Sequence, residues 1–147
     1  MPKAIIIYET RKGSTQLMAE TIQDSMIESG VKVTLKRISE VDIEELKAYA
    51  GVILGSPTYT KDMMGTMKTF LFRLEKANLK GKIGASFGAY GWSGEAVEMI
   101  RDTMKHIFGM EVIEPAVKLA GNVDGVGKAE YQALGKNIAY KIKAKKK

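Results

Sequence analysis

The stretch Lys3-Ala4-Ile5-Ile6-Ile7-Tyr8-Glu9-Thr10-Arg11-Lys12-Gly13-Ser14-Thr15 decides the fold. Its first half is a continuous apolar run, which is typical of a strand buried on both faces. Its second half is polar, contains a glycine and leads into residues 14–29. There, apolar residues recur at helical spacing, namely Met18, Ala19, Ile22 and Met26. A buried strand that turns directly into an amphipathic helix predicts the first half of a parallel β-α-β unit.

The same alternation continues along the chain. Further strands are predicted over residues 31–37, 50–55, 83–87 and 111–114, and helices over 41–48, 63–76, 93–108 and 128–143. The pattern predicts an α/β fold, a three-layer sandwich with a five-stranded parallel sheet of order 2-1-3-4-5 and helices on both faces. The second strand alternates apolar and polar residues and the fifth is short, as edge strands are. The helical residues expected to face inward are Met63, Met67, Phe70, Leu71, Leu74, Ala96, Val97, Ile100, Met104, Ile107, Tyr131, Leu134, Ile138 and Ile142.

Composition narrows the possible functions. The 147 residues suit one domain, expected over 1–147, and no apolar run is long enough to span a bilayer. Without cysteine, and with His106 as the only histidine, disulfides, iron–sulfur clusters and multi-histidine metal sites are excluded, so no metal ligand is predicted. We expect a cytoplasmic protein.

The basic charge is concentrated at the C-terminus. The formal net charge is +6, but five of the 23 basic residues are lysines within the tail, residues 141–147. Without them, 18 basic residues face 17 acidic ones, which is close to neutrality. Lysines at the end of a final helix complement its dipole, so no nucleic-acid partner is expected, although a membrane-surface or partner-docking role for the tail stays open.

Three loops should meet at the carboxyl ends of the strands, where ligands bind in such folds. The first contributes Thr10, Arg11, Lys12, Gly13, Ser14 and Thr15. Hydroxyls and backbone amides at a helix N-terminus form an anion site, so this loop is predicted to bind a phosphate. The alternative is that Ser14 or Thr15 simply caps the helix. A single glycine and no Walker spacing favour a monophosphate over a pyrophosphate or triphosphate.

The other two loops supply groups for a planar aromatic ligand. The second contains Pro57, Thr58, Tyr59 and Thr60, in which hydroxyls can meet a polar ring edge and the tyrosine offers a flat face. The third contains Ala89, Tyr90, Gly91, Trp92, Ser93 and Gly94. The only tryptophan is expected to lie against the ligand, with packing under a neighbouring loop as the alternative. A phosphorylated, planar aromatic cofactor fits this set, and FMN is the natural candidate.

On these residues the chain resembles the flavodoxin superfamily, and more closely the flavodoxin-like FMN domain of A-type flavoproteins (flavodiiron proteins). The matching stretches are Tyr8-Glu9-Thr10 with Gly13-Ser14-Thr15, residues 55–59, and residues 87–96. The resemblance implies a flavodoxin-like fold in which residues 10–15 bind the FMN phosphate. It also implies that residues 57–60 and 89–94 hold the isoalloxazine ring, with Tyr59 and Trp92 nearest to it.

The resemblance has two departures. Flavodiiron proteins carry a separate di-iron domain, which this chain lacks, so oxygen or nitric oxide reduction is not expected from this chain alone. Flavodoxins proper are usually acidic and often have a glycine in the second loop, whereas Tyr59-Thr60-Lys61-Asp62 has none.

No catalytic residue stands out beside the three loops. We therefore expect an electron-transfer protein that shuttles electrons between redox partners, such as ferredoxin-type or flavoprotein donors and acceptors. The alternatives are an FMN-dependent NAD(P)H or quinone-type reductase and a non-redox binding module. The oligomeric state stays open.

Overall fold

A parallel sheet forms the middle layer of the protein. The structure, a computed structural model, describes residues 2–10, 13–59, 62–90, 95–114, 117–120 and 125–145. The strands β1 (Lys3–Tyr8), β2 (Lys32–Arg37), β3 (Gly51–Gly55) and β6 (Ile83–Tyr90) lie in the order β2-β1-β3-β6 and are parallel throughout. Two short strands, β7 (Glu111–Val112) and β8 (Val117–Ala120), both pair in parallel with β6. The predicted order 2-1-3-4-5 is confirmed.

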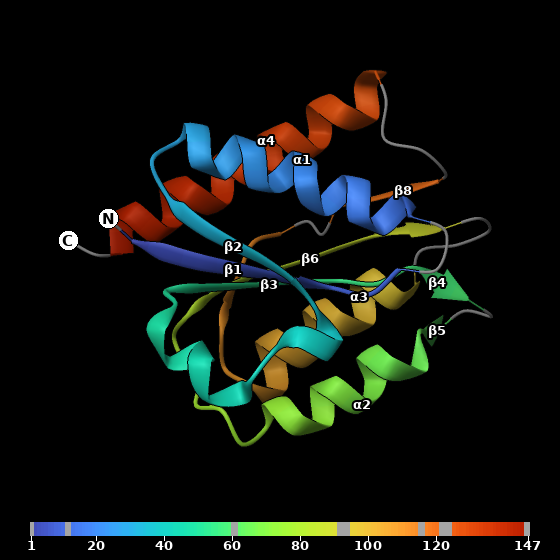
Figure 1. Cartoon of the computed structure of the whole chain (residues 1–147), viewed down its shortest axis with the longest axis vertical. Coiled ribbons are helices and arrows are strands. Elements are labelled where there is room, and N and C mark those ends of the chain that lie inside the picture. The colour runs from blue at the N-terminus through green and yellow to red at the C-terminus, as the bar shows by residue number, and fades with distance from the viewer. Residues whose placement is uncertain are drawn as a thin grey trace.

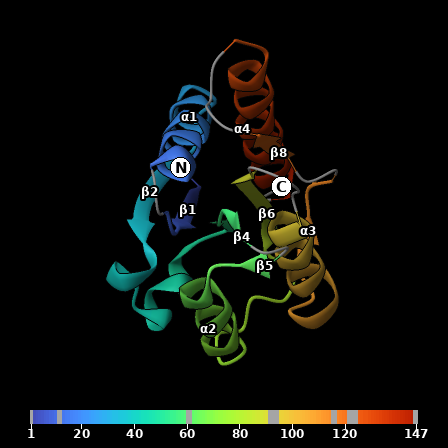
Figure 2. The ribbon, with the colours of Figure 1, turned by 90° about the vertical axis from the view of Figure 1, so that its right-hand side faces the viewer.

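Helices cover both faces of the sheet, as Figures 1 and 2 show. On one face lie α1 (Ser14–Glu28) and α4 (Gly125–Lys145), and on the other lie α2 (Gly65–Leu74) and α3 (Glu95–Asp102). The N-terminus and the C-terminus both lie at the amino ends of the strands (Figure 1). The loops that follow the strands lie at the opposite end.

Each face of the sheet buries its own hydrophobic cluster. Because side chains alternate along β1, Ile6 points to the α1–α4 side and Ile5 and Ile7 point to the α2–α3 side. The predicted stripe of α1 is fully buried, and Tyr131, Leu134, Ile138 and Ile142 of α4 are buried against it. The periodicity of each helix therefore predicted its buried face, with one exception.

The exception is Ile107, which was expected to face inward but is 65% exposed. The predicted helix over 93–108 is an α-helix only over Glu95–Asp102 and continues as a π-helical turn, η3 (Thr103–Ile107). The amide of Phe108 bonds to the carbonyl of Thr103, an i to i+5 hydrogen bond. The wider turn shifts the phase of the stripe after the buried Met104, so Ile107 turns outward.

Other differences concern short elements. The helix predicted over 41–48 is a 3₁₀ helix, η2 (Ile43–Ala48), and a further 3₁₀ turn, η1 (Ile38–Glu40), precedes it. The helix predicted from residue 63 begins at Gly65, because β5 (Asp62–Met63) pairs with β4 (Thr58–Tyr59) in an antiparallel hairpin. The last strand was predicted over 111–114 and comprises two segments, β7 and β8, the second of which lies beyond the predicted range.

Candidate functional site

The three loops singled out in the sequence are joined at the carboxyl edge of the sheet. The amide of Glu9 donates to the carbonyl of Gly55 at 3.0 Å, which ties the first loop to the second. The amide of Ser56 donates to the carbonyl of Phe87 at 3.2 Å, and Thr58 pairs with Tyr90 between β4 and β6, which ties the second loop to the third. Figure 2 looks onto this edge, where the ends of β4 and β6 lie close to α1 and α3.

Two glycines allow the strands to approach closely just below the loops. A β-carbon on Gly88 would lie 2.0 Å from the carbonyl oxygen of Ser56, and one on Gly55 would lie 2.2 Å from the ring of Phe87. Neither position can hold a side chain without displacing its neighbour. These glycines bring the bases of the second and third loops together.

The first loop forms an open helix N-terminus. Gly13 precedes α1 with a φ of 91°, a left-handed conformation that favours glycine, and no side chain among the described ones caps the helix. The Thr10 hydroxyl oxygen instead accepts a hydrogen bond from the Gly13 amide at 3.0 Å. Of the two residues expected as alternative caps, Thr15 makes no such hydrogen bond among the described residues, and the side chain of Ser14 is not described. The first turn contains no acidic residue, so the amides and the dipole of α1 are available to an anion.

Thr15 provides a second observation that fits a ligand at this helix end. The residue is 1% exposed, and its hydroxyl oxygen is buried with no hydrogen-bond partner among the described residues. A buried hydroxyl without a partner costs free energy, so such groups are rare outside ligand sites. The uncapped helix and this hydroxyl together fit a phosphate group, which accepts hydrogen bonds from both.

The second loop is braced from within. The Ser56 hydroxyl donates to the carbonyl of Pro57 at 3.0 Å and accepts from the amide of Met64 at 3.2 Å, so one buried side chain closes the hairpin. Thr58 and Tyr59 form β4, and only their backbone is described. Thr60, predicted for the same loop, lies outside the described residues, as do Arg11 and Lys12 of the first loop.

The third loop begins where β6 ends. Ala89 and Tyr90 are the last residues of β6 and pair with Leu119 and Ala120 of β8. The predicted site residues Gly91, Trp92, Ser93 and Gly94 lie outside the described residues. The pairing also brings the carboxyl end of β8 to the same edge, which the sequence analysis missed. The alternation of Val117 and Leu119 with Lys118 was the available signal.

Glu9 and Arg37, which the sequence analysis did not select, form an ion pair at the base of the first loop. Nη2 of Arg37 lies 2.6 Å from Oε1 of Glu9. Partial burial alone would raise the pKa of the Glu9 carboxyl, but hydrogen bonds from Arg37, the Thr10 amide and the Thr66 side chain lower that pKa below its ordinary value. Glu9 is thus an ionised carboxylate with three donors. No sequence signal linked it to Arg37, 28 residues away.

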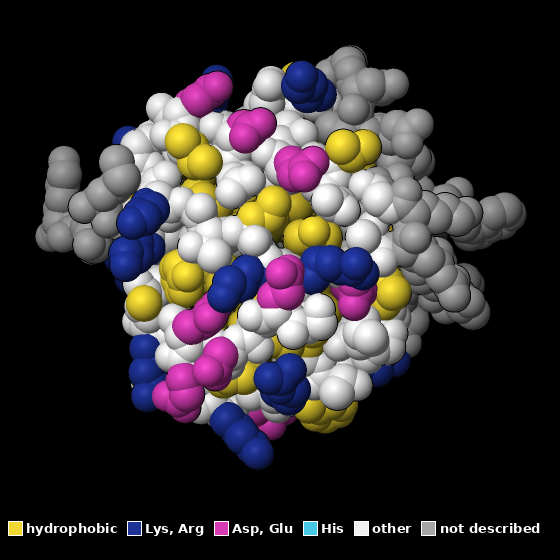
Figure 3. Space-filling model, in the orientation of Figure 1, with side chains coloured by type: hydrophobic (Ala, Val, Ile, Leu, Met, Phe, Trp, Pro, Cys, Tyr) yellow, Lys and Arg dark blue, Asp and Glu magenta, His cyan; other side chains and the backbone are white. Residues whose placement is uncertain are grey.

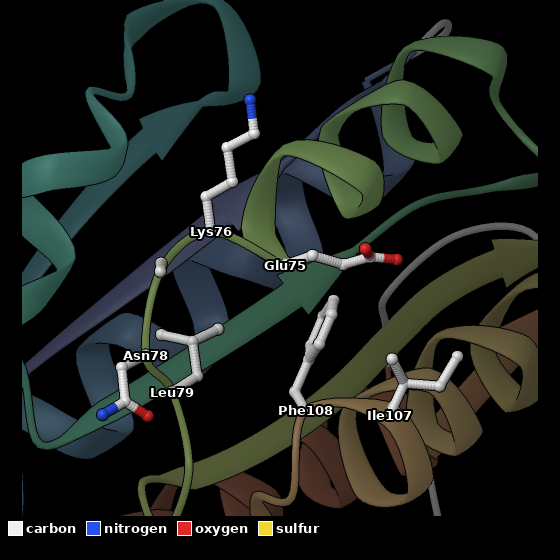
Figure 4. A pocket seen from close by; sticks show the side chains of 7 residues that line it. Glu75, Lys76, Asn78, Leu79, Ile107 and Phe108 are labelled. Atoms are coloured by element: carbon white, nitrogen blue, oxygen red, sulfur yellow. The ribbon is translucent and has the colours of Figure 1, made fainter.

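A separate hollow lies at the amino ends of the strands, far from the three loops. It is lined by residues 75–79 after α2, by Ile107 at the end of η3 and by Phe108 after it (Figure 4). The amide of Gly81 bonds to the carbonyl of Gly109 beside it, just before β6 begins. His106 is exposed and directly precedes Ile107 of this lining. It therefore lies at the end of the fold opposite the loops, as predicted. In Figure 4 Lys76 points away from Phe108.

A doubly wound parallel sheet with an uncapped, glycine-initiated helix N-terminus at its carboxyl edge is the architecture of mononucleotide-binding α/β proteins. The chain belongs to the flavodoxin family, which it matches over residues 6–136. It is also homologous to the flavodoxin-like domain of A-type flavoproteins. Homologous flavodoxins and flavodiiron proteins bind FMN.

Two solved structures are similar to this protein over nearly its whole length. A flavodoxin from the domain Archaea is 36% identical, with a TM-score of 0.92, and the match covers 96% of this chain and 99% of that one. Rubredoxin oxygen:oxidoreductase from Desulfovibrio gigas is 25% identical, with a TM-score of 0.91, and the match covers 97% of this chain and 36% of that one.

Curated relatives include much longer proteins. The nitric oxide reductase of Moorella thermoacetica is 31% identical over 144 residues, which cover 95% of this chain and 36% of the relative. The type A flavoprotein fprA of Rhodobacter capsulatus is 31% identical over 140 residues, which cover 92% and 32%. The chain thus spans about a third of the length of these relatives.

The described residues contain no group of three or more His, Cys, Asp or Glu side chains placed to hold a metal ion. In the same ranges, no helix is both long and apolar enough to cross a bilayer.

Proposed function

We propose that this protein is an FMN-dependent electron carrier that exchanges electrons between redox partner proteins. The observation that carries the proposal is the buried, unpartnered hydroxyl of Thr15 at the uncapped N-terminus of α1. A phosphate would satisfy both the hydroxyl and the helix amides, and FMN has a single terminal phosphate. Family membership and the FMN-binding homologues support the same cofactor.

Each loop has its own part in binding. The hydroxyls of Thr10 and Thr15 donate to the phosphate; Thr10 can do so because its oxygen, not its hydrogen, is used by the Gly13 amide. Residues 57–60 and 89–94 are proposed to flank the ring and exclude water from it. FMN supplies one- and two-electron redox chemistry when bound, and the protein sets its environment.

The proposal of an electron carrier rests on the titratable side chains near the loops. Glu9 is held by Arg37, Thr10 and Thr66, so among the described residues it is a poor proton donor or acceptor for a substrate. The sole histidine lies at the far end of the sheet. The activity named for a longer relative, a nitric oxide reductase, is not carried over, because the match covers 36% of that relative.

The lysine-rich end of α4 does not face the loops. Lys143 donates to the carbonyl of Ser29, and Lys145 pairs with Glu111 at 3.4 Å, both at the amino ends of the strands. Attraction of an acidic partner to this end would not by itself bring it to the proposed flavin site. On the face shown in Figure 3, basic and acidic side chains are interspersed, so this face offers no uniform surface for nucleic acid.

The runner-up function is an FMN-dependent reductase that oxidises NAD(P)H directly. The test is to load the purified protein with FMN and to measure NAD(P)H oxidation with and without a quinone. Direct oxidation should be slow, while a flavin reductase or a ferredoxin-type donor should reduce the protein rapidly. Rapid steady-state turnover without a second protein would favour the reductase, and failure to take up FMN would exclude both.

A further inference from the structure

The Glu9–Arg37 pair joins the residue after β1 to the last residue of β2, and Arg37 also contacts Thr10 of the first loop. Nη2 of Arg37 lies 2.6 Å from Glu9 Oε1 and 3.4 Å from the carbonyl oxygen of Thr10. The same Glu9 oxygen accepts from the Thr10 amide at 3.1 Å. The Glu9 carboxylate therefore binds the backbone amide of Thr10, and the Arg37 guanidinium binds its backbone carbonyl, at the first residue of the loop.

Thr10 in turn shapes the rest of the loop. Its hydroxyl oxygen receives the Gly13 amide at 3.0 Å, and Gly13 is the residue with positive φ that begins α1. The path of contacts runs from Arg37 through Thr10 to Gly13 and the helix N-terminus. Arg37 is the last residue of β2, and its backbone amide donates to the Glu40 side chain of η1 at 2.9 Å.

Arg37 carries the positive charge that offsets the Glu9 carboxylate beside the proposed phosphate loop. The Glu9 carboxylate is ionised and its side chain is only 11% exposed, so water screens it poorly. It stands next in sequence to the loop that is proposed to receive a phosphate. Without a counter-charge, this carboxylate would repel that phosphate.

We propose that Arg37 is a positioning residue for the phosphate loop, which neutralises Glu9 and fixes the Thr10–Gly13 turn, so that the site prefers a phosphorylated flavin. This inference rests on the proposed function. It assigns the preference for FMN over riboflavin partly to a residue that need not touch either flavin.

The test compares FMN and riboflavin binding to apoprotein by quenching of flavin fluorescence, for wild type and R37Q. R37Q should weaken FMN binding about tenfold, because an uncompensated carboxylate then faces the phosphate, and should change riboflavin binding less than about threefold. The double variant E9Q/R37Q should recover most of the FMN affinity, since the repelling charge is gone. High salt should shrink the R37Q deficit for FMN.

K36Q is the matched control. Lys36 is the preceding residue of β2 and pairs with Glu45 at 3.0 Å, away from the loop, so its loss removes the same charge without freeing Glu9. K36Q should leave the ratio of FMN to riboflavin affinity unchanged. If R37Q does not fold, R37K is the second variant, because it keeps the positive charge on a smaller head group. It should lower the ratio of FMN to riboflavin affinity by about threefold.

The outcomes separate the two proposals. Wild-type protein that takes up neither flavin contradicts the proposed function and this inference with it. Wild type that prefers FMN, with the preference unchanged in R37Q, overturns this inference alone. Equal loss of both flavins in R37Q without recovery in E9Q/R37Q also overturns it, because Arg37 would then serve the fold only.

Discussion

A β-carbon on Gly88 would lie 2.0 Å from the carbonyl oxygen of Ser56, so β6 and the start of the second loop touch backbone to backbone. We therefore expect Gly88→Ala to lower the free energy of unfolding by about 1–3 kcal/mol, the usual cost of overpacking. Urea denaturation measures it. Gly65→Ala is the control, because nothing lies within 4 Å of a β-carbon there. Equal stability of the two variants would show that the contact at Gly88 relaxes freely.

Thr15→Val should separate stability from binding. Replacing a buried, unpartnered hydroxyl with a methyl group should leave the apoprotein as stable as wild type or more so. FMN should bind more weakly by about 1.5–3 kcal/mol, the value of a hydrogen bond to a charged group, while riboflavin affinity is unchanged. Flavin titration and thermal unfolding give the two quantities.

The control for Thr15 is Thr21→Val on the same helix. The Thr21 hydroxyl is exposed and donates to the carbonyl of Leu17 at 2.9 Å, far from the loop. This variant should not change FMN affinity. If Thr15→Val weakens the binding of FMN and riboflavin equally, the hydroxyl does not contribute to recognition of the phosphate.

Trp92 provides an internal probe, because it is the only tryptophan in the chain. If it lies beside the flavin, its fluorescence should be strongly quenched when FMN binds to apoprotein. Trp92→Ala should weaken FMN binding and shift the flavin potential, with the far-ultraviolet circular dichroism unchanged. Full tryptophan emission in the FMN complex would mean that the residue only packs against the protein.

Glu9 should make stability depend on acid pH. Its folded-state pKa lies below the ordinary value of 4.5, so its stabilising contribution is complete above that value. The contribution is lost as the pH falls below about 4.5 and through the lower folded-state pKa. Glu9→Gln should flatten the decline in unfolding free energy over this range, as measured by urea denaturation at several pH values.

Glu114→Gln is the comparison for the acid range. The pKa of Glu114 is also lowered, by Lys105 at 2.7 Å, but this pair lies in solvent. Water screens it, so the variant should change the pH dependence less than Glu9→Gln does. A larger effect at Glu114 would contradict the assignment of the acid sensitivity to Glu9.

The sequence by itself determined the elements and their order. The run Ile5–Ile7 predicts a buried strand, and the stripe from Met18 to Met26 predicts the face that α1 buries. Burial of one face of an element requires apolar residues at a regular spacing in that segment of the sequence. Right-handed β-α-β connections then place the loops after residues 8, 55 and 87 at one edge of the sheet. The region of the candidate site followed from this alone.

Only the tertiary structure decided the contacts between elements. Glu9 and Arg37 meet because β1 and β2 pair in a register that sets Tyr8 opposite Arg37. Ile107 is exposed because a π-helical turn shifts the helix phase, which a fixed period cannot predict. The Thr15 hydroxyl lacks a partner only because of how its surroundings pack. Such contacts depend on register and packing across distant segments, whereas sequence periodicity reports only the burial of each segment.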